Sequence, residues 1–128
     1  MSNATNPAEA ALADFTDAGY AQEAAARRYC RALVAYVRES FHEFCLEQDE
    51  DTDLTDLASQ YANDLETVIY THRARALVMG YGEDEARNEF GYQLGFCDPG
   101  DEWGVLASCI LERECAQVAE LVEYDRED

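Results

Sequence analysis

The residues between about Ala21 and Glu47 carry the pattern that most restricts the fold of this chain. Apolar side chains recur there at steps of three and four, the period of an α-helix with one buried face. No stretch alternates apolar and polar residues as a half-buried strand would. Because such a helix must bury its stripe against other elements, the pattern predicts an all-α bundle. The stripe consists of Cys30, Val34, Val37, Phe41 and Phe44.

Weaker signals predict helices on both sides of this one. Asn6-Pro7-Ala8-Glu9 is typical of a helix start, and this first helix should end near Gly19. A third helical region should begin at Asp53 as its N-cap. It has a candidate break at Asn63-Asp64, and Gly80-Tyr81-Gly82 should end it.

The sequence pattern of the C-terminal third predicts two more helices. A short one should run from Glu83 to about Tyr92, and residues 95–100 should form a loop. Asp101 should cap the last helix, which extends to about Tyr124. We therefore expect a four- or five-helix bundle with one long helix (about 21–47) and a long C-terminal helix (about 101–124). The inner face of that last helix is predicted to comprise Trp103, Leu106, Ile110, Val118 and Leu121.

The chain has 128 residues, which predicts a single domain over residues 1–128 with frayed ends at 1–5 and 125–128. No apolar run is long enough for a transmembrane helix, and the N-terminus does not resemble a signal peptide. We therefore expect a cytoplasmic protein with reduced cysteines and no membrane partner. Four of the five cysteines lie among apolar residues and are predicted to be buried core thiols. They are Cys30, Cys45, Cys109 and Cys115.

No motif predicts a metal, a cofactor or a catalytic group. Asp49, Asp51 and Asp53 alternate like the start of a calcium loop, but Leu54 and Gln60 stand where that loop needs Gly and Glu. His42-Glu43 lacks the second histidine of a zinc-protease motif. There is no nucleophile elbow, P-loop or dinucleotide fingerprint. The sequence therefore favours a protein that is not an enzyme.

Charge is the strongest functional signal. The chain has 28 acidic residues and nine arginines, with no lysine, for a net charge of −19. Residues 1–46 hold six acids and four arginines, a net of −2. Residues 47–128 hold 22 acids and five arginines, a net of −17. This balance excludes a protein that binds nucleic acid directly, because such proteins need a basic surface.

The acids fall into three clusters along the sequence. The first two are the predicted partner-binding residues: Glu47, Asp49, Glu50, Asp51, Asp53 and Asp56, and then Glu83, Asp84, Glu85, Glu89, Asp98, Asp101 and Glu102. The third cluster comprises Glu112, Glu114, Glu120, Glu123, Asp125, Glu127 and Asp128.

Gathered on about a third of the surface, this charge would match the density of duplex DNA, about one charge per 110 Å². Such a face would bind the Lys and Arg clusters of proteins that hold nucleic acid. We therefore expect a non-enzymatic inhibitor or decoy. Its partner would be a basic nucleic-acid-binding host protein or defence complex.

The alternative is a helical protein–protein interaction or dimerisation module whose acidity serves solubility or salt adaptation. The helix over residues 21–47 is long enough to form a homodimer. Arg27, Arg28, Arg31 and Arg38 could then pair with an acidic cluster of the second chain. The dependence of binding on salt concentration distinguishes the two hypotheses, because screening weakens a complex held by charged groups more than one held by apolar contacts.

The stretch from Leu65 to Leu77, with Val68-Ile69-Tyr70 followed by an Ala/Arg-rich turn, resembles a helix of small phage-encoded proteins. In size, acidity and helical content the whole chain also resembles phage anti-restriction and anti-CRISPR proteins of the DNA-mimic type. That resemblance implies inhibition of a host defence complex. It carries no site residue over to this sequence.

Overall fold

The computed structural model describes residues 7–15, 20–64, 71–96 and 101–127. These residues form six α-helices and one 3-10 helix, and they contain no strand. The all-α class and the two long helices are therefore confirmed. The elements are α1 (Pro7–Asp14), α2 (Tyr20–Leu46), α3 (Leu54–Asn63), α5 (Thr71–Tyr81), α6 (Glu83–Phe90), the 3-10 helix η1 (Gly91–Phe96) and α7 (Glu102–Glu127).

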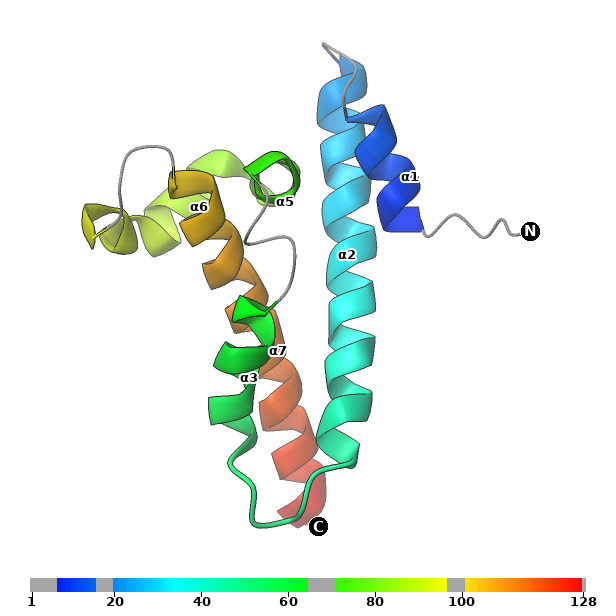
Figure 1. Cartoon of the computed structure of the whole chain (residues 1–128), viewed down its shortest axis with the longest axis vertical. Helices are drawn as coiled ribbons and strands as arrows, with labels where there is room; N and C mark the ends of the chain where they lie inside the picture. Colours follow the sequence, from blue (N-terminus) through cyan, green and yellow to red (C-terminus); the bar gives the residue numbers. More distant parts are fainter. Residues whose placement is uncertain (1–6, 16–19, 65–70, 97–100, 128) are drawn as a thin grey trace.

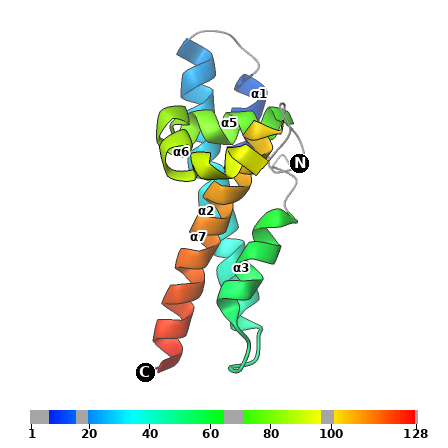
Figure 2. The same cartoon turned by 90° about the vertical axis from the view of Figure 1, so that its left-hand side faces the viewer.

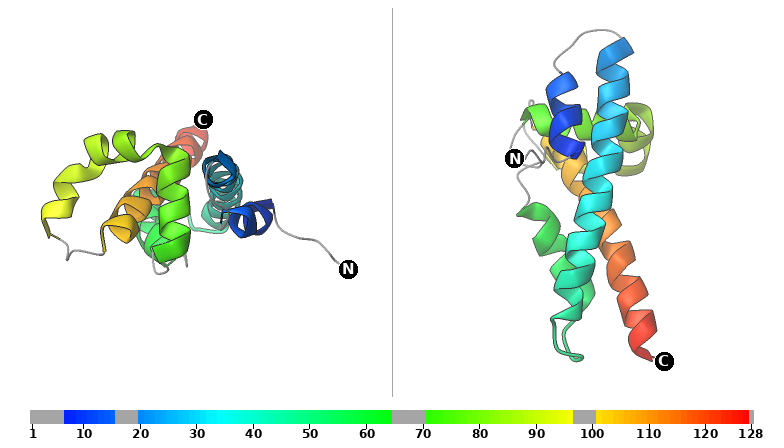
Figure 3. Two further views of the ribbon diagram at one scale, coloured as in Figure 1. Left: turned by 90° about the horizontal axis from the view of Figure 1, so that it is seen from above. Right: turned by 90° about the vertical axis from the view of Figure 1, so that its right-hand side faces the viewer.

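The two long helices, α2 and α7, run in the same direction, and the space between them in the view of Figure 1 narrows toward the end where both finish, while Figure 3 shows that they also cross at an angle. Helix α3 runs back along α7, and α1 runs antiparallel to the first half of α2 (Figures 1 and 2). At the other end α5 crosses between the long helices and contacts both. Helix α6 and η1 extend away from α2 there (Figure 3). The molecule therefore has a crossing end and a converging end.

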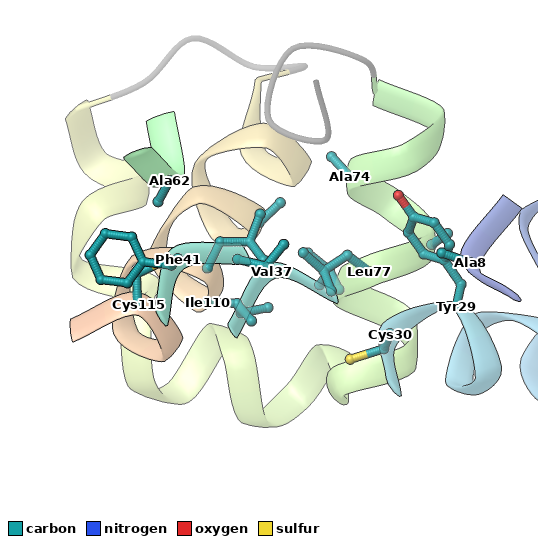
Figure 4. Close-up of a cluster of buried hydrophobic side chains, with 14 of the residues drawn as sticks. Ala8, Tyr29, Cys30, Val37, Phe41, Ala62, Ala74, Leu77, Ile110 and Cys115 are labelled. Atoms are coloured by element: carbon teal, nitrogen blue, oxygen red, sulfur yellow. The ribbon is translucent and has the colours of Figure 1, made fainter. Parts of the chain in front are cut away.

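Side chains of α2 form the centre of the core. Val37 and Phe41 are buried, in one cluster with Ile110 and Cys115 of α7 (Figure 4). The Phe41 ring lies 5.1 Å from that of Tyr61 on α3, measured between centroids. Burying aromatic and branched side chains in this way supplies most of the driving force for association of the helices.

The predicted stripe of α2 is confirmed at its centre. Cys30, Val37 and Phe41 are buried, whereas Val34 and Phe44 are half-buried at the margin. On α7 the prediction for Leu121 is wrong, because its side chain is 57% exposed. Its neighbours Val118 and Val122 face the core instead, and the α-helical turn of 100° per residue directs position 121 outward.

Several boundaries agree with the sequence. Asp53 caps α3, and α3 ends at Asn63 as the candidate break suggested. Helix α7 continues to Glu127, past the expected end near Tyr124, and residues 91–96 form η1 where a helix end and a loop were expected. Asn6 and Gly19 lie outside the described residues.

The predicted helix end at Gly80-Tyr81-Gly82 is confirmed, and Gly80 has a packing role in addition. Helix α5 continues to Tyr81, and Gly82, with a φ of 121°, precedes α6. A Cβ atom on Gly80 would lie 2.0 Å from the carbonyl oxygen of Ala26 and 2.7 Å from the Cβ atom of Cys30. Helices α2 and α5 therefore cross so closely that residue 80 has no room for a side chain larger than the hydrogen atom of glycine.

We expect Gly80→Ala to lower the free energy of unfolding by about 3 kcal/mol or more, because the new methyl group would force the helix backbones apart. Gly91→Ala is the matched control, since no atom lies within 4 Å of a Cβ built there. Chemical denaturation followed by circular dichroism measures both variants. Equal stabilities would contradict the proposed close crossing.

Candidate functional site

The first acidic cluster occupies the connector between α2 and α3, at the converging end of the molecule (Figure 1). Its six members, Glu47 to Asp56, are all exposed. From residue 39 to residue 64 the chain contains nine acids and no arginine. Among the described residues, no arginine forms an ion pair with any of these carboxylates. Their charge therefore faces solvent without compensation.

Asp53 also has a structural role in this connector. One carboxylate oxygen, Oδ1, accepts hydrogen bonds from the Thr55 hydroxyl at 2.8 Å and from the backbone N–H groups of Thr55 at 3.0 Å and Asp56 at 3.4 Å. These donors, the Thr55 hydroxyl foremost, hold the pKa of Asp53 below its ordinary value. Asp53 thus fixes the start of α3, and Asp56 lies in the first turn, where the helix dipole favours a negative charge.

Arg126 of α7 holds the other side of the connector. Its guanidinium donates hydrogen bonds to the backbone carbonyls of Cys45 at 3.2 Å, Gln48 at 3.0 Å and Asp49 at 3.3 Å. The end of α2 exposes such carbonyls and carries a partial negative charge, so a cation is favourable there. Sequence reasoning missed this contact because a partner 77 residues away leaves no local pattern.

The same contact brings the end of α7 beside the connector. Glu50 of the connector and Asp125 of α7 line one groove, together with His42 and Arg126. Glu123 lies close enough to Cys45 to raise the pKa of that thiol, although burial contributes more. We call the surface formed by these carboxylates the acidic pole. It comprises Glu47, Asp49, Glu50, Asp51, Asp53, Asp56, Glu123 and Asp125.

Three of the six described members of the second acidic cluster are paired with arginine. Arg87 binds Glu83 at 3.0 Å and Glu102 at 3.1 Å, joining α6 to the start of α7. Arg113 pairs with Glu89. These pairs neutralise part of the cluster and fix α6 on α7. Asp84, Glu85 and Asp101 remain exposed without an ion pair to another described residue, and the predicted site residue Asp98 lies outside the described residues.

The two predicted clusters do not form one patch. Helix α6 lies at the crossing end and the acidic pole at the converging end, as both side views show (Figures 1 and 2). The 26 residues of α7 separate the two ends by about 39 Å at a rise of about 1.5 Å per residue. Of the third cluster, Glu123 and Asp125 belong to the pole, whereas Glu114 pairs with Arg38 at 2.8 Å.

The four arginines of α2 differ in their surroundings. Arg38 donates hydrogen bonds to Glu114 and Gln117 of α7, so it joins two helices of its own chain and is not available to a second chain as predicted. Arg27, Arg28 and Arg31 are exposed on the outer side of α2.

The cysteines form part of the core. Cys30, Cys45 and Cys115 are buried as predicted, whereas Cys109 is half-buried. Burial raises the pKa of Cys30 to about 11 and that of Cys115 to about 12. These thiols stay protonated near neutral pH, and a protonated thiol is a poor nucleophile and metal ligand.

The two histidines are both exposed on helices, His42 on α2 and His72 on α5. The His72 ring lies 5.3 Å from the ring of Phe15. Within the described residues, no group of three or more His, Cys, Asp or Glu side chains is arranged to hold a metal ion. None of the described helices combines the length and the apolar character needed to span a bilayer.

Comparison with known proteins found no matching family model, no similar curated protein and no similar solved structure.

We expect Arg126→Ala to lower the free energy of unfolding by about 1 kcal/mol, because the Cys45 carbonyl of α2 and the Gln48 and Asp49 carbonyls of the connector lose their donor. Arg126→Lys should recover part of this loss, since it keeps the charge but not the forked donor. Arg27→Ala is the control, because an exposed surface change alters stability by about 0.5 kcal/mol at most. Equal losses for Arg126→Ala and Arg27→Ala would contradict the assigned role.

The buried thiols give stability a definite dependence on alkaline pH. Below pH 9 they are protonated in both the folded and unfolded states. Above the ordinary value of 9.0 the unfolded chain loses these protons while the folded chain, with raised pKa values, retains them. The unfolded state is therefore favoured, and we expect the free energy of unfolding to fall as pH rises from about 9 through the folded pKa values of about 11 and about 12.

Denaturant titrations at several pH values measure this slope. Cys115→Ala should make it shallower, because one raised pKa is removed. A slope identical to that of the natural chain would show that Cys115 does not contribute.

Proposed function

We propose that the protein is a non-enzymatic inhibitor or decoy that uses its acidic pole to occupy a basic nucleic-acid-binding surface of another protein. The observation that carries the proposal is the pole itself. Eight carboxylates from two separate segments lie there beside a single arginine, Arg126, whose guanidinium is turned toward backbone carbonyls. The second cluster contributes less, because Glu83, Glu89 and Glu102 already pair with arginines.

Charge density explains why the pole matters more than the net charge. The surface area of 7686 Å² divided among 19 net charges gives about 400 Å² per charge. Duplex DNA carries about one charge per 110 Å². Spread evenly, the charge would be too dilute to compete with DNA, so competition requires the local concentration that the connector provides. A fixed connector also loses little conformational entropy on binding, and the Asp53 cap and Arg126 both hold it.

The resemblance to phage anti-restriction and anti-CRISPR proteins agrees with this proposal but rests on composition. Under the proposal the partner is a host defence complex or another protein that holds nucleic acid. The protein acts by occupancy alone, with no bond made or broken. The alternative, a helical interaction module whose acidity serves solubility or salt adaptation, requires no particular concentration of charge at the pole.

A pair of variants with equal net charge tests the proposal. Glu47→Gln/Asp49→Asn/Glu50→Gln/Asp51→Asn neutralises the pole, and Asp84→Asn/Glu85→Gln/Asp101→Asn/Glu112→Gln removes four charges elsewhere. Binding to a fluorescent nona-arginine peptide is measured by anisotropy at about 0.15 M salt. We expect the pole variant to bind about 10- to 30-fold more weakly, since each exposed charge contributes a few tenths of a kcal/mol or more. The second variant should bind within about threefold of the natural chain.

Equal weakening of both variants would show that net charge alone attracts the peptide, and the acidic pole would then have no special role. The natural partner is sought by affinity capture from a host lysate with and without excess duplex DNA. Capture of a nucleic-acid-binding protein that DNA displaces, and that the pole variant fails to capture, supports the decoy. Capture that is indifferent to DNA contradicts it.

A further inference from the structure

No other helix that the structure describes packs along one long face of α2. Helices α1, α5 and α7 pack on its other sides, and the view onto α2 shows it at the front over its whole length (Figure 3). The uncovered positions follow the spacing 4, 3, 4, 4, 3, 4, which places them on one side of a helix. We call this face the outer stripe. It comprises Ala24, Arg28, Arg31, Ala35, Glu39, His42 and Leu46.

The outer stripe is symmetric in position about Ala35, and its central pair of charged residues has opposite signs. Four residues before Ala35 stands Arg31, and four residues after it stands Glu39. Outside the stripe, Arg27 lies eight residues before Ala35 and Glu43 eight residues after it, on opposite flanks of the helix. All four side chains are exposed, and none forms an ion pair with another described residue.

Within one chain this order of charges is unfavourable. Arg27 and Arg31 are separated by four residues, as are Glu39 and Glu43, and like charges at that spacing repel by a few tenths of a kcal/mol. Arg31 and Glu39 are too far apart along the helix to reach each other, since eight residues span about 12 Å. A second helix that runs antiparallel and is centred on Ala35 would place its Glu39 across from Arg31.

We propose that the protein forms a two-fold symmetric homodimer in which the outer stripes of two copies pack antiparallel about Ala35. The small side chain of Ala35 lies on the axis and permits close approach of the helices. Ala24 then lies opposite Leu46 of the second copy. The Leu46 side chain, which is 62% exposed in the single chain, would pack over the small side chain of Ala24. Two copies of one surface, related by a two-fold axis, form the commonest type of homodimer contact.

The long-range charge of the molecule also favours the antiparallel orientation. A parallel pair would bring two acidic poles side by side. In the antiparallel pair the two ends of α2 at Leu46 lie about 33 Å apart along the axis, because each is 11 residues from Ala35. That separation is about four Debye lengths at physiological salt, where the screening length is about 8 Å. The repulsion between the poles is then largely screened, while the central ion pairs remain short.

Three charge-swap variants test both the dimer and its register by sedimentation equilibrium. Arg31→Glu and Glu39→Arg each convert two attractive pairs into repulsive ones, so each should weaken dimerisation about tenfold or more. Arg31→Glu/Glu39→Arg in one chain restores the pairs with their signs exchanged. It should recover dimerisation to within about threefold of the natural chain. Asp84→Arg, an exposed reversal on α6, is the control and should leave dimerisation unchanged.

Each other outcome overturns the inference. A natural chain that sediments as a monomer has no such dimer. Single swaps without effect place the contact on another face. A double swap as weak as the single ones excludes the antiparallel register, because a parallel pair would put position 31 beside position 31. Circular dichroism shows whether each variant retains its helices. This inference is independent of the proposed function, since the swaps leave the connector unchanged.

Discussion

The packing of α2 against its three neighbours is the interaction on which the rest of the structure depends. Gly80 allows α5 to cross α2 at backbone contact, and Val37 and Phe41 join α2 to the core beside α7. Because α2 reaches from the crossing end to the converging end, its orientation decides where the following connector emerges. The orientation of α2 therefore places both proposed surfaces. The acidic pole lies where the chain leaves α2, and the outer stripe is the side of α2 on which no described helix packs.

The small number of arginines affects the distribution of surface charge as much as the large number of acidic residues does. Among the described residues, Arg38, Arg73, Arg87 and Arg113 form ion pairs between or within helices, and these pairs neutralise carboxylates near α1, along α7 and around α6. Arg126 binds backbone carbonyls instead, so its charge stabilises the connector without pairing with the acidic side chains there. No ion pair between described residues includes a carboxylate of the pole, so the pole keeps its negative charge.

The two proposals use adjoining surfaces, which meet at His42, a member of the outer stripe that also lines the groove of the acidic pole. The decoy would act through the connector at the end of the helix, whereas the homodimer would form along its side. An antiparallel dimer would leave both acidic poles accessible at opposite ends. Binding through one pole would not require the dimer to separate.

The sequence by itself determined the helices, because periodicity, the Asp53 cap and the glycine stop near residue 82 act over a few residues. It also determined the net charge and the exposure of the connector. The tertiary structure alone decided which acids are paired, since Arg87 and Glu102 or Arg38 and Glu114 meet only after distant helices pack. For the same reason it decided that Leu121 is exposed, that Arg126 holds the connector, and that the first and second acidic clusters lie at opposite ends of α7. Such contacts depend on helix orientation, for which local spacing carries no signal.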